Sequence, residues 1–221
     1  MIGIRVQLKI DPELADLGMA MNIGMLDYNV TVSASDEGLF TTMREAMSLR
    51  IEELMGESAS SDPAIANIRS AFKKTGKDPS RYRPSSEAIT RRVLSGKGIS
   101  SINNVVDCGN LVSLMTGIPV GCYDTDKIKG DIVLHIGKKN ESYEGLGRGD
   151  VNLEGLPVLC DDLGPFGTPF SDSVRTPVGP ECTKLTLIIF GINIDIEHVE
   201  AAAEIADTLV TSFCINNTDK A

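Results

Sequence analysis

The sequence lacks the motifs of the common catalytic machineries. It contains no P-loop sequence GxxxxGK[ST], no HExxH and no GxSxG. The glycines of the run GLGRG at 145–149 lack GxGxxG spacing and do not stand between a strand and a long helix. We interpret this run as a flexible turn. These absences exclude the usual nucleotide, dinucleotide and metalloprotease sites, and we expect no cofactor.

Paired cysteines are also missing. The cysteines are odd in number, scattered along the chain and without CxxC spacing: Cys108, Cys122, Cys160, Cys182 and Cys214. Neither a zinc site nor a disulfide framework is indicated, so we expect reduced, mostly buried thiols and no metal. The two histidines, His135 and His198, have no obvious nucleophile nearby in the sequence, and we interpret both as structural.

Long apolar runs are absent as well. No run reaches the length of a membrane helix, and residues 1–10 alternate instead of forming a signal-peptide block. We therefore expect a cytoplasmic protein without membrane contact. The 221 residues, 42% of them hydrophobic, can bury a core in one large domain or two small ones. We favour one domain over 1–221, with N-terminal strands and helices (1–72), a motif-bearing core (73–190) and a C-terminal helix (191–221).

Negative charge dominates the composition, but it is unevenly distributed. The formal charge of −10 argues against nucleic-acid binding by the whole surface. From 69 to 97, nine basic residues stand against two acidic ones, a local charge of +7 against −17 elsewhere. This basic segment is either a solvated face or a patch that contacts phosphate. For the second interpretation the candidate nucleic-acid-binding residues are Lys73, Lys74, Lys77, Arg81, Arg83, Arg91 and Arg92.

Hydrophobic periodicity predicts an α/β fold with mixed sheets and packed helices. Alternation over 2–10 and 26–32 predicts two strands that pair in the same sheet. Helical spacing predicts helices at about 35–54, 62–74, 84–95, 101–116 and 196–213. Short apolar runs predict further strands at 118–122, 132–136, 156–159 and 185–190. The glycine-rich segments 141–150 and 161–176 are predicted to be loops, and long loops in compact domains are often functional.

A thin polar stripe follows the helix predicted over 101–116. Asn103, Asp107 and Asn110 share one narrow arc between two apolar faces. In one interpretation these side chains satisfy buried backbone groups of the next segment, as buried polar groups usually do. In the other they line a pocket and bind substrate together with Ser171.

The two glycine-rich loops carry the best candidates for chemistry: Glu144, Asp172, Arg175 and Thr176. The alternative is an Asx-type turn with a local ion pair. In an ester-hydrolysing site without a nucleophile, Arg175, Thr176 and Asn110 would donate to the developing oxyanion. Glu144 or Asp172 would orient water. Arg175→Ala and Glu144→Ala are accordingly predicted to lower activity at least about tenfold, and His135→Asn to affect mainly stability.

Three stretches carry a resemblance to a known family: RYRPSSEA at 81–88, NNVVDCGN at 103–110 and GIPVGCYD at 117–124. They are similar to the B3/B4 domain of the phenylalanyl-tRNA synthetase beta chain. More closely, the chain resembles free-standing bacterial proteins made of that domain alone. The resemblance covers about 73–190.

The resemblance implies an α/β module whose editing pocket hydrolyses tRNA charged with tyrosine instead of phenylalanine. Such a pocket works chiefly by holding the ester and a water, so no triad is required. The implied partners are tRNA or aminoacyl-tRNA, with an amino acid or aminoacyl ester in the pocket. The chain is too short for the synthetase core and has no class II ATP-binding motif, so aminoacylation by it alone is not expected. The loop 164–170 departs from the synthetase pocket, which leaves the discriminated amino acid open.

Three functional hypotheses remain. The first is an aminoacyl-tRNA deacylase that acts in trans, and the second is a tRNA or RNA binding module without catalysis. The third is an amino-acid or small-ligand binding module, which the overall acidity favours. An open cleft beside the basic segment would support the first two, and a closed apolar pocket would support the third.

Overall fold

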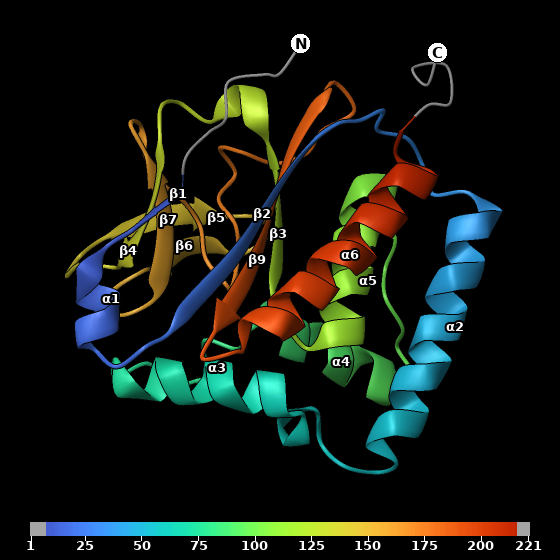
Figure 1. Cartoon of the computed structure of the whole chain (residues 1–221), viewed down its shortest axis with the longest axis horizontal. Helices are drawn as coiled ribbons and strands as arrows, with labels where there is room; N and C mark the ends of the chain where they lie inside the picture. Colours follow the sequence, from blue (N-terminus) through green and yellow to red (C-terminus); the bar gives the residue numbers. More distant parts are fainter. Residues whose placement is uncertain (1–7, 216–221) are drawn as a thin grey trace.

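A computed structural model describes residues 8–215 (Figure 1). The helices are α1 (Pro12–Asp16), α2 (Glu37–Leu54), α3 (Pro63–Lys74), α4 (Ser85–Leu94), α5 (Asn104–Thr116) and α6 (Ile196–Phe213), with short 3₁₀ turns at Ala59–Ser61 and Thr125–Lys127. The strands are β1 (Leu8–Ile10), β2 (Met21–Asn29), β3 (Val120–Asp124), β4 (Ile132–Ile136), β5 (Ser142–Gly145), β6 (Gly149–Asn152), β7 (Pro157–Asp161), β8 (Gly164–Gly167) and β9 (Lys184–Ile192).

The strands form two sheets and a separate hairpin. One sheet has the order β1-β4-β7-β8, in which β1 runs parallel to β4 and the other pairs are antiparallel. The other sheet, β2-β9-β3, is antiparallel throughout, and β5 pairs with β6 as a hairpin. The predicted α/β class with mixed sheets and packed helices is confirmed.

The predicted pairing of the two N-terminal strands is wrong. β1 joins β4 in the first sheet, whereas β2 joins β9 in the second. All residues of β9 after Lys184 are buried, so this central strand needs a hydrogen-bonded neighbour on each side, and the nine-residue β2 supplies one of them. Residues 1–7 of the predicted first strand lie outside the described residues.

The glycine-rich segments contain more regular structure than predicted. The run 145–149 is the turn of the β5–β6 hairpin, where Gly147 and Gly149 have φ of 66° and 70°. Such left-handed conformations suit glycine because it has no Cβ. The second segment contains β8, which pairs with β7. The second segment is therefore held to the first sheet, and the hairpin is held to the second segment by the bonds Leu146 N–H to Asp172 O and Val174 N–H to Glu144 O.

Helix α5 lies at the centre of the helical half of the molecule, packed against α2, α4, α6 and β3 (Figure 1). It begins at Asn104 because the Asn103 side chain accepts from the Val106 N–H and caps the first turn. It ends at Gly117, whose φ of 72° forms a left-handed C-cap that suits glycine. The α4–α5 contact is one of the helix–helix contacts of the predicted fold class.

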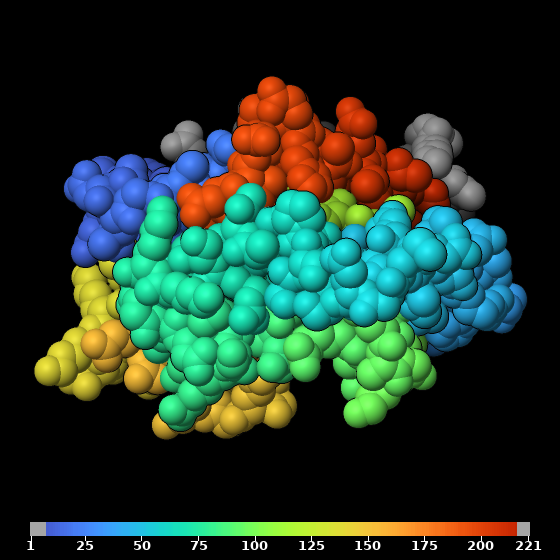
Figure 2. Space-filling view, turned by 90° about the horizontal axis from the view of Figure 1, so that it is seen from below, coloured from blue at the N-terminus to red at the C-terminus, as the bar shows by residue number. Residues whose placement is uncertain are grey.

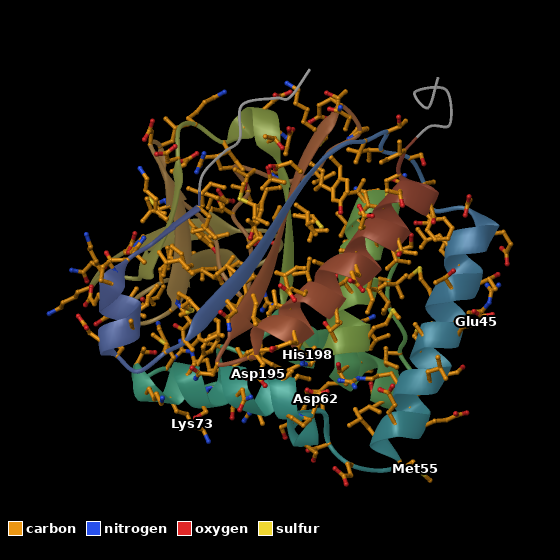
Figure 3. The ribbon with its side chains drawn as sticks, viewed as in Figure 1. Glu45, Met55, Asp62, Lys73, Asp195 and His198 are labelled. Carbon is orange, nitrogen blue, oxygen red and sulfur yellow. The ribbon has the colours of Figure 1, made fainter. Side chains whose placement is uncertain are left out.

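Helix α3 crosses the lower side of the molecule, and its outer surface fills the centre of the view from below (Figures 1 and 2). Asp62 lies at the start of α3 (Figure 3). It caps this helix by accepting from the Ile65 N–H, and it also pairs with the buried Arg50 of α2. A buried carboxylate and guanidinium thus fix the junction between α2 and α3 next to the C-terminal end of α5.

Candidate functional site

A pocket of about 340 Å³ opens between α5, β3 and the segment 168–178. Its volume lies in the range of small-molecule sites. The lining residues are Ser85, Ile102, Val106, Gly109, Asn110, Val120, Cys122, Leu146, Thr168, Ser171, Asp172, Pro177 and Val178. The structure thus brings together three of the site residues predicted from the sequence: Asn110, Ser171 and Asp172.

The wall between α5 and β3 depends on a glycine inside the helix. A Cβ at Gly109 would lie 2.5 Å from the Cys122 sulfur, so only glycine allows this close approach. A glycine inside a helix costs about 1 kcal/mol relative to alanine, which makes it a signal of close packing. The sequence analysis missed both residues, although the glycine in an otherwise apolar helix pointed to this wall.

Asp172 supplies the carboxyl group of the pocket lining. The Tyr123 hydroxyl donates to Asp172 Oδ1 at 2.7 Å. Burial raises the pKa of the Asp172 carboxyl from 3.8 to about 7, even though the bonds from Tyr123 and the Thr168 backbone lower it. A carboxyl group with this pKa is present in both protonation states near neutral pH, which suits a general base or acid.

Tyr123 is placed by two glycines and a ring contact. Cβ atoms at Gly121 and Gly167 would each lie 2.2 Å from the Tyr123 hydroxyl oxygen, so the phenol occupies a slot that only glycines leave open. The ring packs edge-on against Phe166 with centroids 5.0 Å apart. Tyr123 is fully buried, and the sequence analysis did not assign it to the site.

The segment 168–172 is held rigidly at the pocket mouth. The Thr168 hydroxyl oxygen accepts from the N–H groups of Phe170 and Ser171, at 3.2 and 3.0 Å. It also donates to the Ser171 carbonyl at 2.8 Å, and the Tyr143 hydroxyl donates to the same carbonyl. The Ser85 N–H donates to Pro169 O at 2.8 Å, which joins the first turn of α4 to this segment.

The three polar residues of the α5 stripe have different roles: two bond to neighbouring segments, and one lines the pocket. Asp107 is fully buried and accepts from the Ser35 hydroxyl at 2.6 Å and from the Ile102 N–H at 2.9 Å, so it satisfies neighbouring segments. Asn103 caps the helix and donates to Val178 O at 3.3 Å. Only Asn110 lines the pocket.

Three predicted catalytic residues do not line the pocket. Arg175 forms a two-pronged ion pair with the buried Asp161, at 2.8 and 3.1 Å, and also donates to Gly164 O and Lys127 O. Thr176 is fully buried. Glu144 lies exposed on β5, where its carbonyl accepts from the Val174 N–H. These contacts hold the chain on either side of Asp172.

The two histidines lie outside the pocket lining. His135 Nε2 lies 3.1 Å from the Glu141 carboxylate, which also accepts from the Lys138 N–H. His198 is exposed in the first turn of α6 (Figure 3).

Much of the basic segment is internally neutralised. The buried Glu87 carboxylate of α4 lies 2.7 Å from Arg69, 3.5 Å from Arg83 and 4.0 Å from Arg91. Lys77 is buried and donates to Asn152 O, and burial lowers its pKa. The remaining predicted nucleic-acid-binding residues are exposed: Lys73, which projects from the outer side of α3 (Figure 3), Lys74, Arg81 and Arg92.

Within residues 8–215, no group of three or more His, Cys, Asp or Glu side chains is placed to hold a metal ion. In the same range no helix has the length and apolar character needed to cross a membrane. All five cysteines are free thiols. Burial raises the pKa of the Cys122 thiol in the pocket wall, which keeps it protonated.

The chain matches the model of a known domain family. The B3/4 domain family matches residues 67–214, which include every residue of the pocket lining. The chain belongs to the B3/4 domain family.

Relatives of this B3/4 domain protein are beta subunits of phenylalanine–tRNA ligase. The subunit from Mycoplasma genitalium is 33% identical over 135 residues, covering 60% of this chain and 16% of the subunit. The Wolbachia subunit is 24% identical over 180 residues, covering 79% and 20%. An N-terminal fragment of the Pyrococcus horikoshii phenylalanyl-tRNA synthetase beta subunit gives a TM-score of 0.49 at 16% identity, covering 94% of this chain and 49% of the fragment. The chain spans a fifth or less of the two curated relatives.

Proposed function

We propose that this B3/4 domain binds aminoacyl-tRNA and hydrolyses its ester bond, with the amino acid held in the pocket. The observation that carries the proposal is Asp172, a carboxyl group with a pKa of about 7 in the wall of a pocket of suitable size. The relationship to phenylalanine–tRNA ligase beta subunits supports tRNA as the partner. Such a protein would act in the cytoplasm.

The proposed reaction needs no covalent intermediate. Ionised Asp172 accepts a proton from a bound water as that water attacks the ester carbonyl. The tetrahedral intermediate then loses the ribose oxygen by cleavage of the ester C–O bond, and protonated Asp172 returns its proton to that oxygen. Asn110, Ser85 and Ser171 supply donors around the pocket for the developing oxyanion. We assign Arg175 and Thr176 to holding the segment that carries Asp172.

A non-catalytic amino-acid or small-ligand binding module is the second candidate. It is favoured by the apolar part of the lining, to which Ile102, Val106, Val120 and Val178 contribute. The two candidates differ in turnover, because a binding module holds the same ligand without cleaving it.

A deacylation assay over a panel of correctly and wrongly charged tRNAs tests the proposal. We expect at least one ester to be cleaved faster than its spontaneous rate, and Asp172→Asn to slow that cleavage at least about tenfold. Glu45→Gln, the same chemical change on the exposed outer side of α2, is the control and should leave the rate unchanged (Figure 3). Cleavage of no ester would favour the binding module.

A further inference from the structure

A second hollow is lined by Phe170, which belongs to the same segment 168–172 as the pocket residues Ser171 and Asp172. It has a volume of about 200 Å³, and its lining includes Arg81, Tyr82, Arg148, Asp150 and Phe170. The β5–β6 turn contributes to both hollows, through Leu146 in the pocket and Arg148 in this cleft. Phe170 lines the cleft and the adjoining Ser171 lines the pocket, so the two hollows have neighbouring residues of one segment in their walls.

Aromatic rings hold the cations of this cleft in place. The Arg148 guanidinium lies 4.6 Å from the centroid of the Phe170 ring, and Arg81 lies 5.8 Å from that of Tyr82. The two rings meet edge-on, 5.4 Å apart, and Lys77 Nζ lies 4.1 Å from the Tyr82 centroid. Such contacts orient a guanidinium without neutralising it.

The two arginines of the cleft have no carboxylate partner, which distinguishes them from three other arginines near the site. Arg69, Arg83 and Arg175 form ion pairs with buried carboxylates. Among the described residues, neither Arg81 nor Arg148 forms an ion pair. Both are exposed, so their donors are available to an anion from outside the chain.

We propose that this cleft binds one nucleotide of a single-stranded nucleic acid. The phosphate lies between Arg81 and Arg148, since guanidinium groups bind phosphate with two parallel hydrogen bonds. The base stacks on the Arg148 guanidinium, which lies over the Phe170 ring. This assignment rests on the proposed function only in taking RNA as the partner.

The test is a binding titration of the full chain with a fluorescently labelled, short single-stranded RNA at several salt concentrations. Arg148→Ala should weaken binding about tenfold and reduce the log–log salt slope by about 0.7, the value for one phosphate contact on a single strand. Arg148→Lys should keep the slope and still bind about fivefold more weakly, because lysine retains the charge and loses the stacking plane. Arg44→Ala removes another exposed guanidinium, on α2, and should change affinity by less than about twofold.

The outcomes separate this proposal from the proposed function. If Arg148→Ala behaves like Arg44→Ala while the wild type binds RNA, the cleft assignment is overturned and RNA binding stands. Adenosine monophosphate and inorganic phosphate are titrated in parallel. Binding of the mononucleotide as tightly as the RNA identifies free nucleotide as the source, whereas phosphate binding as tightly as either overturns the base-stacking assignment. A wild type that binds neither RNA nor nucleotide overturns the cleft, and ester cleavage is judged separately by the deacylation assay.

Discussion

At the residue scale, Asp172 combines two opposing influences. Burial disfavours its charge, while hydrogen bonds from Tyr123 and Thr168 favour it, and burial dominates. The hydroxyl of Tyr123 is itself buried, and burial together with the nearby Asp172 charge raises the pKa of the phenol. Tyr123 therefore stays a neutral donor while Asp172 titrates. The pair is arranged so that one group changes charge near neutral pH and the other keeps its proton.

The raised pKa of Asp172 predicts a specific pH dependence of stability. Its folded pKa of about 7 exceeds the ordinary 3.8, so between these values the folded chain keeps a proton that the unfolded chain has lost. The free energy of unfolding should therefore fall as pH rises through this window and level off above it. Asp172→Asn has no carboxyl group at this position, so its free energy of unfolding should not show this fall. From pH 5 to pH 8 the stability difference should shift toward the variant by on the order of 2 kcal/mol.

Urea denaturation of both proteins across the pH range measures this shift. Glu45→Gln is again the matched control, since its carboxylate is exposed and its difference from the wild type should stay constant. Parallel stability profiles for Asp172→Asn and the wild type would contradict the assigned pKa.

The three pocket residues that were predicted from the sequence share one property. Asn110, Ser171 and Asp172 are polar and lie at positions where the local pattern is apolar or glycine-rich. Arg175 satisfies the same criterion, but its partner Asp161 lies fourteen residues earlier, across the β7–β8 pair. No local pattern shows such a partner. Tyr123 was missed because a tyrosine in an apolar strand has the pattern of a core residue.

At the element scale, α3 and α4 share a buried ionic centre. Glu87 is 1% exposed, and Arg69 of α3 lies 2.7 Å away, so the carboxylate joins the two helices. Breaking such a pair leaves an uncompensated buried charge. Part of the charge that the sequence assigns to a nucleic-acid face is therefore used to pack two helices together. The remaining candidates for contact with nucleic acid are the arginines and lysines that lie outside this ionic centre or at its edge.

Replacing Arg91 and Arg92 with glutamate should weaken RNA binding without unfolding the protein. Both arginines are exposed at the end of α4, and Arg91 lies 4.0 Å from Glu87, while the shorter Arg69 pair remains. Salt titrations of RNA affinity should show a slope shallower by about 0.7 to 0.9 for each phosphate that the variant no longer neutralises. Melting followed by circular dichroism checks the fold, and Arg44→Glu on α2 controls for the charge change. Unchanged affinity and slope would remove this part of the segment from the nucleic-acid face.

Element identity was predictable where the pattern was long, and element pairing was not. The helices α2, α3 and α6 lie close to their predicted ranges because their apolar residues repeat over two turns or more. The strand predicted over 26–32 lies instead at Met21–Asn29. Alternation alone does not show which edge of which sheet a strand joins. That choice depends on β9, which lies about 160 residues further along the chain.

At the scale of the whole molecule, the family match and the core have different extents. The match begins at residue 67, yet one continuous core includes Leu39 and Met43 of α2 along with residues of both sheets. β2 also covers one edge of the central strand β9 over its whole length. The segments before residue 67 therefore supply β2 to the β2-β9-β3 sheet and α2 to the helical layer.

We propose from this continuity that the chain folds as one cooperative domain, and predict a single unfolding transition. Far-UV circular dichroism and tyrosine fluorescence should give coincident curves, since the chain has four tyrosines and no tryptophan. Leu39→Ala in α2 and Leu134→Ala in β4 remove fully buried side chains from opposite parts of the core. Each should lower the stability of that same transition by about 2 to 5 kcal/mol at both probes. The fragment 67–221, which lacks β1, β2 and α2, should show no cooperative transition. Two separated transitions, or a fragment that unfolds cooperatively by itself, would instead divide the chain into two domains.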